Sequence, residues 1–317
     1  MAQLAAAGDY TKPGFFDRFR LTKRERRNLA KGLLFISPWI IGFVAFLLYP
    51  MIYTIRIGFT DYSGFGEPTW IGLGNYERML RDDLFWTSLY NTFYYTALAV
   101  PIGVVVAMAL ALAMNQRLPE VPIYRAILYL PSILPLFALS FIYLTLMDPT
   151  KGIFNRFLIF IGLPNVNWFG DPTYSKLALV ILAQFGAGQV AIIFLAGLKG
   201  IPQTLYEAAS LDGAGTWRKF KNVTLPLMTP VILYDIILGL TLGIQIFTQI
   251  YVIFGTDPPG NPTNSTLTYV IYLYVNGFRY SQMGYAAAQA WVLFLITLVL
   301  ALLIFRWSKR WVHYETI

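Results

Sequence analysis

The chain has 317 residues, of which 57% are hydrophobic and only 13% carry a charged side chain. Soluble globular domains average about 25% charged residues, so this composition excludes an ordinary soluble fold and indicates a membrane protein. The chain has no cysteine and a single histidine, His313, which excludes disulfides, a cysteine nucleophile, a histidine-based catalytic triad and the usual zinc sites. The net charge of +8 suits either nucleic acid or anionic lipid as a partner, and the distribution of the charges decides between them.

Six apolar segments are long enough to cross a bilayer as helices, which takes about 20 residues each. In chain order they are 33–55, 88–113, 126–147, 177–198, 227–254 and 283–305. The sequence therefore predicts an all-α polytopic membrane protein with six transmembrane helices. The expected domains are a basic N-terminal segment at 1–31, a membrane domain at 32–306 and a tail at 307–317.

The basic residues assign the connecting segments to two sides of the membrane. Seventeen of the 24 Lys and Arg residues lie before span one, between spans two and three, between spans four and five, or after span six. Six lie in the three alternate loops, and Arg56 ends span one. The positive-inside rule therefore predicts that both termini are cytoplasmic, with the basic opening at 18–27 stopping the first span at the lipid surface. Because the charge is a topology signal, we expect no nucleic acid partner.

The loop between spans four and five, 199–226, is the most informative connection. Pro202 suits the first turn of a helix over 203–211, the Asp212-Gly213 pair signals the turn that ends it, and Thr216 can cap a second short helix before Pro226 opens span five. Alanines at positions 208 and 209 let another protein approach closely, beside a carboxylate at position 207. The chemistry alone leaves two roles open, a docking surface and an amphipathic connector lying on the bilayer.

The spacing of the fixed residues in this loop resembles the EAA loop of the ABC importer permeases. The matching positions are Glu207, Ala208, Ala209, Asp212, Gly213, Ala214, Phe220, Val223, Leu225 and Pro226. Only Val223 departs from the commoner isoleucine. In that family the loop forms a coupling helix that sits in a cleft of the ATPase subunit. The resemblance implies this role for the six positions from Glu207 to Ala214, with Phe220, Leu225 and Pro226 as scaffold.

Further motifs along 30–315 are similar to those of the maltose-type carbohydrate-uptake permeases. They are 37–39 (SPW), 49–50 (YP), 70–76 (WIGLGNY), 91–92 (NT), 129–131 (YLP) and 152–155 (GIFN). The closing 311–315 (WVHYE) is more similar to the MalF-like subunit than to its MalG-like partner. The resemblance implies the type I importer (MetI-like) permease fold in the cell membrane of a bacterium or archaeon. It also implies a MalG-like second permease, two ABC ATPase subunits and an extracytoplasmic substrate-binding protein.

The chain lacks the means to bind ATP by itself. No Gly-Lys dipeptide occurs, so there is no P-loop to cradle phosphates. We therefore expect a non-catalytic subunit with no catalytic or metal-binding residues and no cofactor of its own. ATP and Mg²⁺ are expected on the partner ATPase subunits.

A sugar pathway needs hydrogen-bonding side chains inside the membrane, and glycines there let a ligand approach the backbone. The candidates in spans four and five are Gln184, Gly186, Gln189, Gln245, Thr248, Gln249 and Tyr251. If span five is one helix, Gln245, Thr248 and Gln249 share a face because they are three and four residues apart. The other interpretation is that these amides tie neighbouring helices together.

Three cargo or energy-coupling hypotheses remain besides a di- or oligosaccharide importer. The same permease could carry a polyol or glycerol phosphate, although a phosphate would call for arginines, and the spans hold none beyond Arg56. An ion-coupled secondary transporter would need several titratable groups in the spans, where Asp235 is the only acid. We expect Asp235 to reach cytoplasmic water or a neighbouring subunit.

Overall fold

The computed structural model describes residues 22–116 and 119–313. These residues are mostly helical, and the strands among them form a two-residue antiparallel pair, β1 (Thr60–Asp61) and β2 (Thr69–Trp70). Helices suit a chain in lipid, because a helix satisfies its backbone N–H and C=O groups internally. The chain divides into two compact units between residues 56 and 57.

The first unit is formed by one helix of 36 residues, which extends slightly into the second unit. Its parts are α1 (Lys23–Phe43), the π-helical turn η2 (Val44–Leu48) and α2 (Tyr49–Gly58). A capping box starts it: the Thr22 hydroxyl accepts from the Glu25 backbone N–H at 3.3 Å, and the Glu25 carboxylate accepts from the Thr22 backbone N–H at 2.7 Å. The first predicted span lies within this helix.

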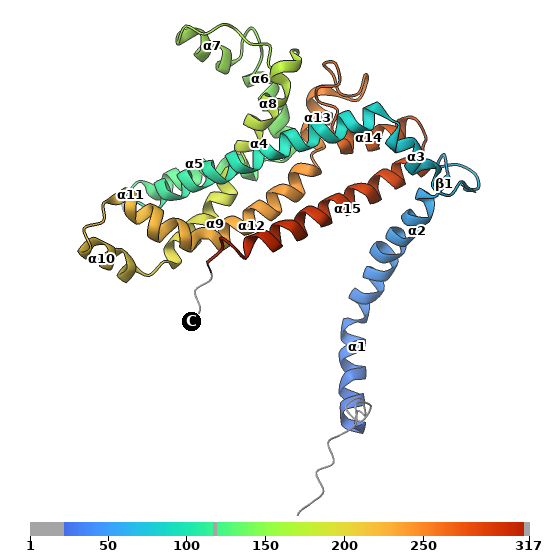
Figure 1. The fold of residues 1–317 in the computed structure, drawn as a ribbon, viewed down its shortest axis with the longest axis horizontal. Helices are drawn as coiled ribbons and strands as arrows, with labels where there is room; N and C mark the ends of the chain where they lie inside the picture. Colours follow the sequence, from blue (N-terminus) through green and yellow to red (C-terminus); the bar gives the residue numbers. More distant parts are fainter. Residues whose placement is uncertain (1–21, 117–118, 314–317) are drawn as a thin grey trace, which may run out of the picture. The chain divides into compact units, whose positions relative to one another are not determined.

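The second unit is built on three long helices that run alongside one another (Figure 1). They are α4 (Asp83–Met114), α12 (Leu225–Ile244) and α15 (Met283–Ser308), with α12 between the other two. Two short elements before α12, the helix α11 (Thr216–Lys219) and the π-helical turn η3 (Phe220–Thr224), join it in one continuous helix over Thr216–Ile244. These helices contain the second and sixth predicted spans and most of the fifth.

The third and fourth spans are broken helices. The first pair, α5 (Val121–Ile133) and α6 (Leu136–Leu146), bends by 103°, and the second, α8 (Pro172–Gln184) and α9 (Ala187–Gly200), bends by 46°. The prediction of one continuous helix over 126–147 is therefore wrong, because Pro135 has no N–H and keeps Leu134 in an extended conformation. Across 22–116 and 119–313, four helices are long and apolar enough to cross a membrane, or six if each bent pair is one span. The predicted six spans agree with the upper count.

Small side chains let α4 and α9 pack closely. Ala107 and Ala111 on α4 and Ala191 on α9 are fully buried, together with the larger Phe194 and Met228. Small residues at such an interface allow two helix backbones to approach each other, which is the usual means of helix association in membranes.

The fifth span is also interrupted, contrary to the predicted continuous helix over 227–254. Helix α12 ends at Ile244, residues 245–247 are not helical, and α13 (Thr248–Phe254) follows. Gln245 caps α12 with ψ +18°, and Phe247 precedes α13 with φ −140° and ψ −62°. The argument that Gln245 and Thr248 share one helical face is therefore wrong, because no helix joins them.

The short helices α3 (Gly74–Leu80) and α14 (Tyr269–Tyr274), with the π-helical turn η4 (Val275–Arg279), lie at the opposite end of the long helices from the loop at 199–226 (Figure 1). Asp82 joins them to the long helices. One carboxylate oxygen caps α4, and the other accepts from the hydroxyls of Tyr272 at 2.5 Å and Tyr285 at 2.6 Å.

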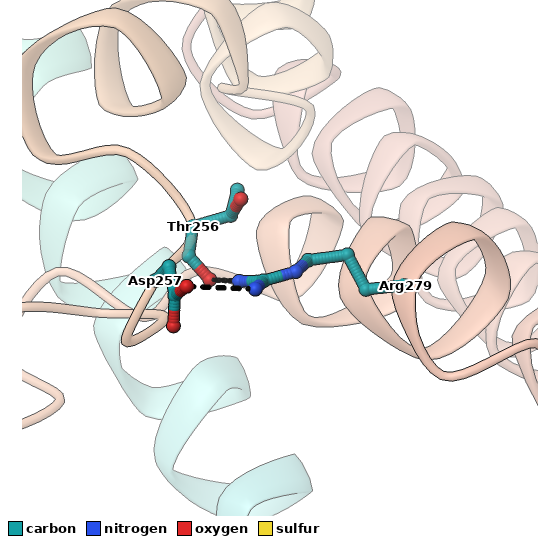
Figure 2. Close-up of polar contacts among 3 residues, drawn as sticks. All are labelled: Thr256, Asp257 and Arg279. Carbon is teal, nitrogen blue, oxygen red and sulfur yellow. Dashed lines mark hydrogen bonds and ion pairs between the residues drawn. The ribbon is translucent and has the colours of Figure 1, made fainter.

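Arg279 of η4 anchors the loop that follows α13. Figure 2 shows the Arg279 guanidinium directed at the Asp257 carboxylate, 3.0 Å away, and at the backbone carbonyl of Thr256, to which it donates a hydrogen bond. Because the side chains of Arg279 and Asp257 are 34% and 84% exposed, the ion pair contributes at most roughly 1 kcal/mol.

Candidate functional site

The second unit contains a cavity of about 560 Å³ where its three broken spans meet. One wall is the α4 segment from Tyr95 to Gly103. The other walls come from the α5–α6 break, the α8–α9 break and the end of α12 with the start of α13. Interrupted helices leave backbone polar groups without helical partners, and inside a membrane such backbone is tolerated only where it is buried in protein or lines a cavity.

Six of the seven predicted pathway residues lie in the cavity wall. They are Gln184, Gly186, Gln189, Gln245, Thr248 and Gln249. The seventh, Tyr251, is not part of the lining. Its ring packs against Phe247 at 5.3 Å and edge-on against Tyr274 at 5.6 Å between ring centroids. The span-five residues Gln245, Thr248 and Gln249 come together at the cavity because the span is broken there, and not because they share one helical face as predicted.

Gln184 combines the two roles that the sequence left open. Its amide nitrogen donates to the carbonyl of Val180 at 2.9 Å and, more weakly, to that of Ala99 on α4 at 3.4 Å, so it ties α8 to α4. Its amide oxygen is buried and accepts no hydrogen bond from any residue that the structure describes. A buried acceptor without a donor costs about 1–3 kcal/mol, so this oxygen is available to a donor in the cavity.

Three further polar residues of the wall were not among the sequence candidates for the pathway in spans four and five. Tyr95 lies on α4, Ser132 precedes the α5–α6 break and Asp235 lies in the middle of α12. The prolines at 131 and 135 are the signal that could have identified Ser132, because they mark a break in the third span.

Asp235 lies elsewhere than expected. Its side chain is 9% exposed and lines the cavity, whereas the sequence suggested contact with cytoplasmic water or another subunit. It is the only charged residue in the cavity wall as described.

The loop at 199–226 forms the elbow that the sequence predicts. Helix α10 (Gln203–Leu211) ends at Asp212, and Gly213 adopts φ +73°, a left-handed conformation that suits glycine. The backbone N–H of Ala214 then donates to the carbonyl of Ala209 at 2.9 Å, which closes the turn.

Two details of the predicted elbow are wrong. Pro202 is the N-cap residue of α10 and does not lie in its first turn. The N-cap of α11 (Thr216–Lys219) is Gly215, and Thr216 makes no capping hydrogen bond. Pro226 lies in the first turn of α12, where it was predicted to open span five, and α11 runs through the π-helical turn η3 (Phe220–Thr224) into α12 without a break.

The elbow presents an open surface at one end of the long helices (Figure 1). No residue of α10 is buried, Glu207 and Ala208 are exposed, and the apolar side chains of Leu211 and Trp217 are 90% and 71% exposed. A hydrogen bond of 2.9 Å between the hydroxyls of Tyr206 and Thr224 fastens α10 to the start of span five. Exposed apolar side chains beside a fixed charge are typical of an interaction surface.

Comparison with known proteins identifies relatives along nearly the whole chain. Residues 89–313 match the family of binding-protein-dependent transport system inner membrane components. The chain is 37% identical to the probable ABC transporter permease protein YesP of Bacillus subtilis, covering 95% of this chain and 97% of YesP. It is 33% identical to the arabinooligosaccharides transport system permease protein AraP of the same organism, covering 86% and 87%. It is 31% identical to the trehalose/maltose transport system permease protein MalF of Thermococcus litoralis, covering 87% and 93%.

Solved structures confirm the predicted fold. The chain superposes with a TM-score of 0.79 on a chain of a bacterial alginate ABC transporter in complex with an alginate pentasaccharide-bound periplasmic protein, at 25% identity, covering 92% of this chain and 98% of the other. The helical architecture is that of an ABC importer permease with the MetI-like fold. The chain belongs to the family of binding-protein-dependent transport system inner membrane components and is an ABC transporter permease.

Proposed function

We propose that the chain is the MalF-like permease subunit of an ATP-driven importer for a neutral di- or oligosaccharide. It forms half of the translocation pathway and couples to ATPase subunits through the loop at 199–226. One observation carries this proposal: a single continuous helix, Thr216–Ile244, joins an exposed elbow of the coupling type to a cavity lined with amides.

The cavity wall supports a sugar as the cargo. Four glutamines, with Thr248 and Ser132, supply both hydrogen-bond donors and acceptors, which a polyhydroxylated molecule needs. Apart from Tyr95 and Asp235, the rest of the wall is apolar, as is usual for small-molecule sites. The names of the relatives point the same way: AraP is named for arabinooligosaccharides, and MalF for trehalose and maltose.

The proposed complex contains other subunits and ligands besides this chain. They are a MalG-like second permease, two ABC ATPase subunits, an extracytoplasmic binding protein, and ATP with Mg²⁺ on the ATPase subunits. Both termini of this chain are cytoplasmic in the proposed topology. Six residues of the elbow make the contact with an ATPase subunit, and three more support it. The contact residues are Glu207, Ala208, Ala209, Asp212, Gly213 and Ala214, and the supporting residues are Phe220, Leu225 and Pro226.

Two alternatives receive less support. Glycerol phosphate would need cations along the pathway, and no Lys, Arg or His lies in the described cavity wall. A neutral polyol fits the same wall. An ion-coupled transporter would need several ionisable or ion-coordinating groups at one depth, and Asp235 is the only acid in that wall.

The test begins with purification of the tagged chain from its native membrane in mild detergent. We expect a second six-span permease and a P-loop ATPase to co-purify. Isolation of the chain alone, together with solute transport in the absence of ATP, would refute the proposal.

Charge reversal then tests the coupling surface. Glu207→Lys should uncouple uptake from ATP hydrolysis while membrane insertion stays normal, because Glu207 is exposed on α10. Glu67→Lys makes the same charge change in the exposed loop between β1 and β2 and should leave uptake unchanged. Equal uptake in both variants and the unaltered chain would contradict the assignment of α10.

A further inference from the structure

The carboxylate of Asp235 has an unusual position in the cavity. Asp235 lies near the middle of α12, one helical turn before Gly239, and both residues line the wall. The residue is only 9% exposed, and its carboxylate faces the cavity without a hydrogen-bond or ion-pair partner among residues 22–116 and 119–313. A carboxylate withdrawn from water is costly unless it has a partner, so its free acceptor sites favour a ligand that donates hydrogen bonds.

The surrounding elements do not neutralise this charge. The part of α4 in the wall contributes Tyr95, Ala99, Val100 and Gly103. The α5–α6 break contributes apolar side chains and Ser132, and the α8–α9 break contributes amides, glycine and apolar side chains. None of these groups is a cation, so the described wall has a negative field that is only weakly screened.

We propose that Asp235 determines the charge specificity of the cavity: its carboxylate accepts hydrogen bonds from the hydroxyls of neutral saccharides and repels saccharides that carry a carboxylate, such as uronates. This proposal rests on the proposed function for the identity of the cargo as a sugar. The fold does not itself exclude acidic cargo, since the alginate importer that shares it imports an acidic polysaccharide. Discrimination within the cavity is therefore a property of the residues of its wall.

The size of the effect follows from Coulomb's law. Two unit negative charges about 6 Å apart, at an effective dielectric constant of about 20, disfavour binding by about 100-fold. Replacing Asp235 by Asn removes the charge, keeps the shape and leaves the hydrogen-bonding capacity, so a neutral sugar should lose little.

The first experiment tests, with no sugar present, whether Asp235 carries an effective negative charge in the cavity. The chain has no cysteine, so Ser132→Cys places its single thiol in the cavity wall. In the purified complex, two methanethiosulfonate reagents of similar size, one with a trimethylammonium group and one with a sulfonate, are compared by their rates of reaction with this thiol. We expect Asp235→Asn to lower the ratio of the cationic to the anionic rate by at least 10-fold.

A matched control lies outside the cavity wall. Leu163→Cys places the thiol in the loop after α7 (Ile153–Phe160), where Leu163 is 49% exposed, and its rate ratio should not respond to Asp235→Asn. If Ser132→Cys does not assemble, Thr248→Cys provides a second thiol in the same wall. A ratio at the cavity thiol that Asp235→Asn leaves unchanged would overturn the proposal, because Asp235 would then carry no effective charge there.

The second experiment compares the binding of a neutral and an acidic sugar in the cavity. A neutral disaccharide and its uronate counterpart are titrated for protection of the Ser132→Cys thiol against an uncharged reagent. In the parent chain we expect the neutral sugar to protect at about 100-fold lower concentration than the uronate, and Asp235→Asn should reduce this preference at least 10-fold.

The two experiments separate the two proposals. An unchanged preference after Asp235→Asn, with protection by the neutral sugar intact, overturns the role of Asp235 and leaves the sugar importer standing. Protection by neither sugar contradicts the sugar cargo itself, and with it the ligand class assigned to Asp235.

Discussion

The hydrogen bond between Tyr206 and Thr224 is the side-chain link from α10 to span five, and Tyr206→Phe removes it with little change in packing. The two hydroxyls are 2.9 Å apart, and Thr224 is only 5% exposed. A neutral hydrogen bond of this kind contributes about 1 kcal/mol, because the Thr224 hydroxyl can still bond to a carbonyl of its own helix. We therefore expect the docked position of α10 to lose roughly 5-fold in equilibrium population.

The assay is the number of sugar molecules imported per ATP hydrolysed by the complete transporter in proteoliposomes. Tyr206→Phe should lower this ratio by up to about 5-fold, while the basal ATPase rate changes less. Thr224→Val should have a similar effect, and the double variant should be no worse than the stronger single variant. Tyr124→Phe, on the exposed face of α5, is the control for loss of a hydroxyl. An unchanged ratio in Tyr206→Phe, or additive losses in the double variant, would refute the reasoning.

Two further predictions concern assembly of the second unit. Gly188→Ala should destabilise it by about 1–3 kcal/mol and lower the yield of folded protein, because the new Cβ would lie 2.1 Å from the backbone carbonyl oxygen of Leu128; a normal yield and melting temperature in detergent would contradict this contact. Asp82→Asn should lower the free energy of unfolding by about 2 kcal/mol, because the hydroxyls of Tyr272 and Tyr285 donate to the charged oxygen of Asp82. The lost stability should appear as a lower Tm. Asp83→Asn, at the exposed neighbouring position, is the matched control, and equal Tm values in the two variants would disprove the role of Asp82.

Hydropathy was sufficient to predict the number of spans but not their shape. A run of apolar residues indicates that a segment can lie in lipid, but it does not indicate whether the helix is continuous. Pro135 carried a local signal for the break in the third span. The break at 245–247 carried none, because Gln245 and Thr248 suit a helix and a cavity wall equally well. Only the three-dimensional packing, of α12 on α4 and of α13 on α6, shows that the helix ends here.

The elbow was more predictable because nearby residues in the sequence determine where its helix begins and ends. Gly213 must adopt a positive φ, and a proline next to the first turn defines where α10 begins. Asp235 shows the opposite case. Its depth in the sequence suggested cytoplasmic water, but the packing of three other segments around α12 decides that its carboxylate faces the cavity.

The continuity of the helix over Thr216–Ile244 gives the molecule a mechanical property. Its 29 residues span about 43 Å at ~1.5 Å per residue, and the turn η3 bulges the helix without interrupting it. A rod of this length that tilts by about 5° about one end moves its other end by about 4 Å, which is larger than a hydrogen bond. A small displacement at the elbow therefore reaches the cavity wall directly, so that opening and closing the pathway needs no flexible relay between the two ends.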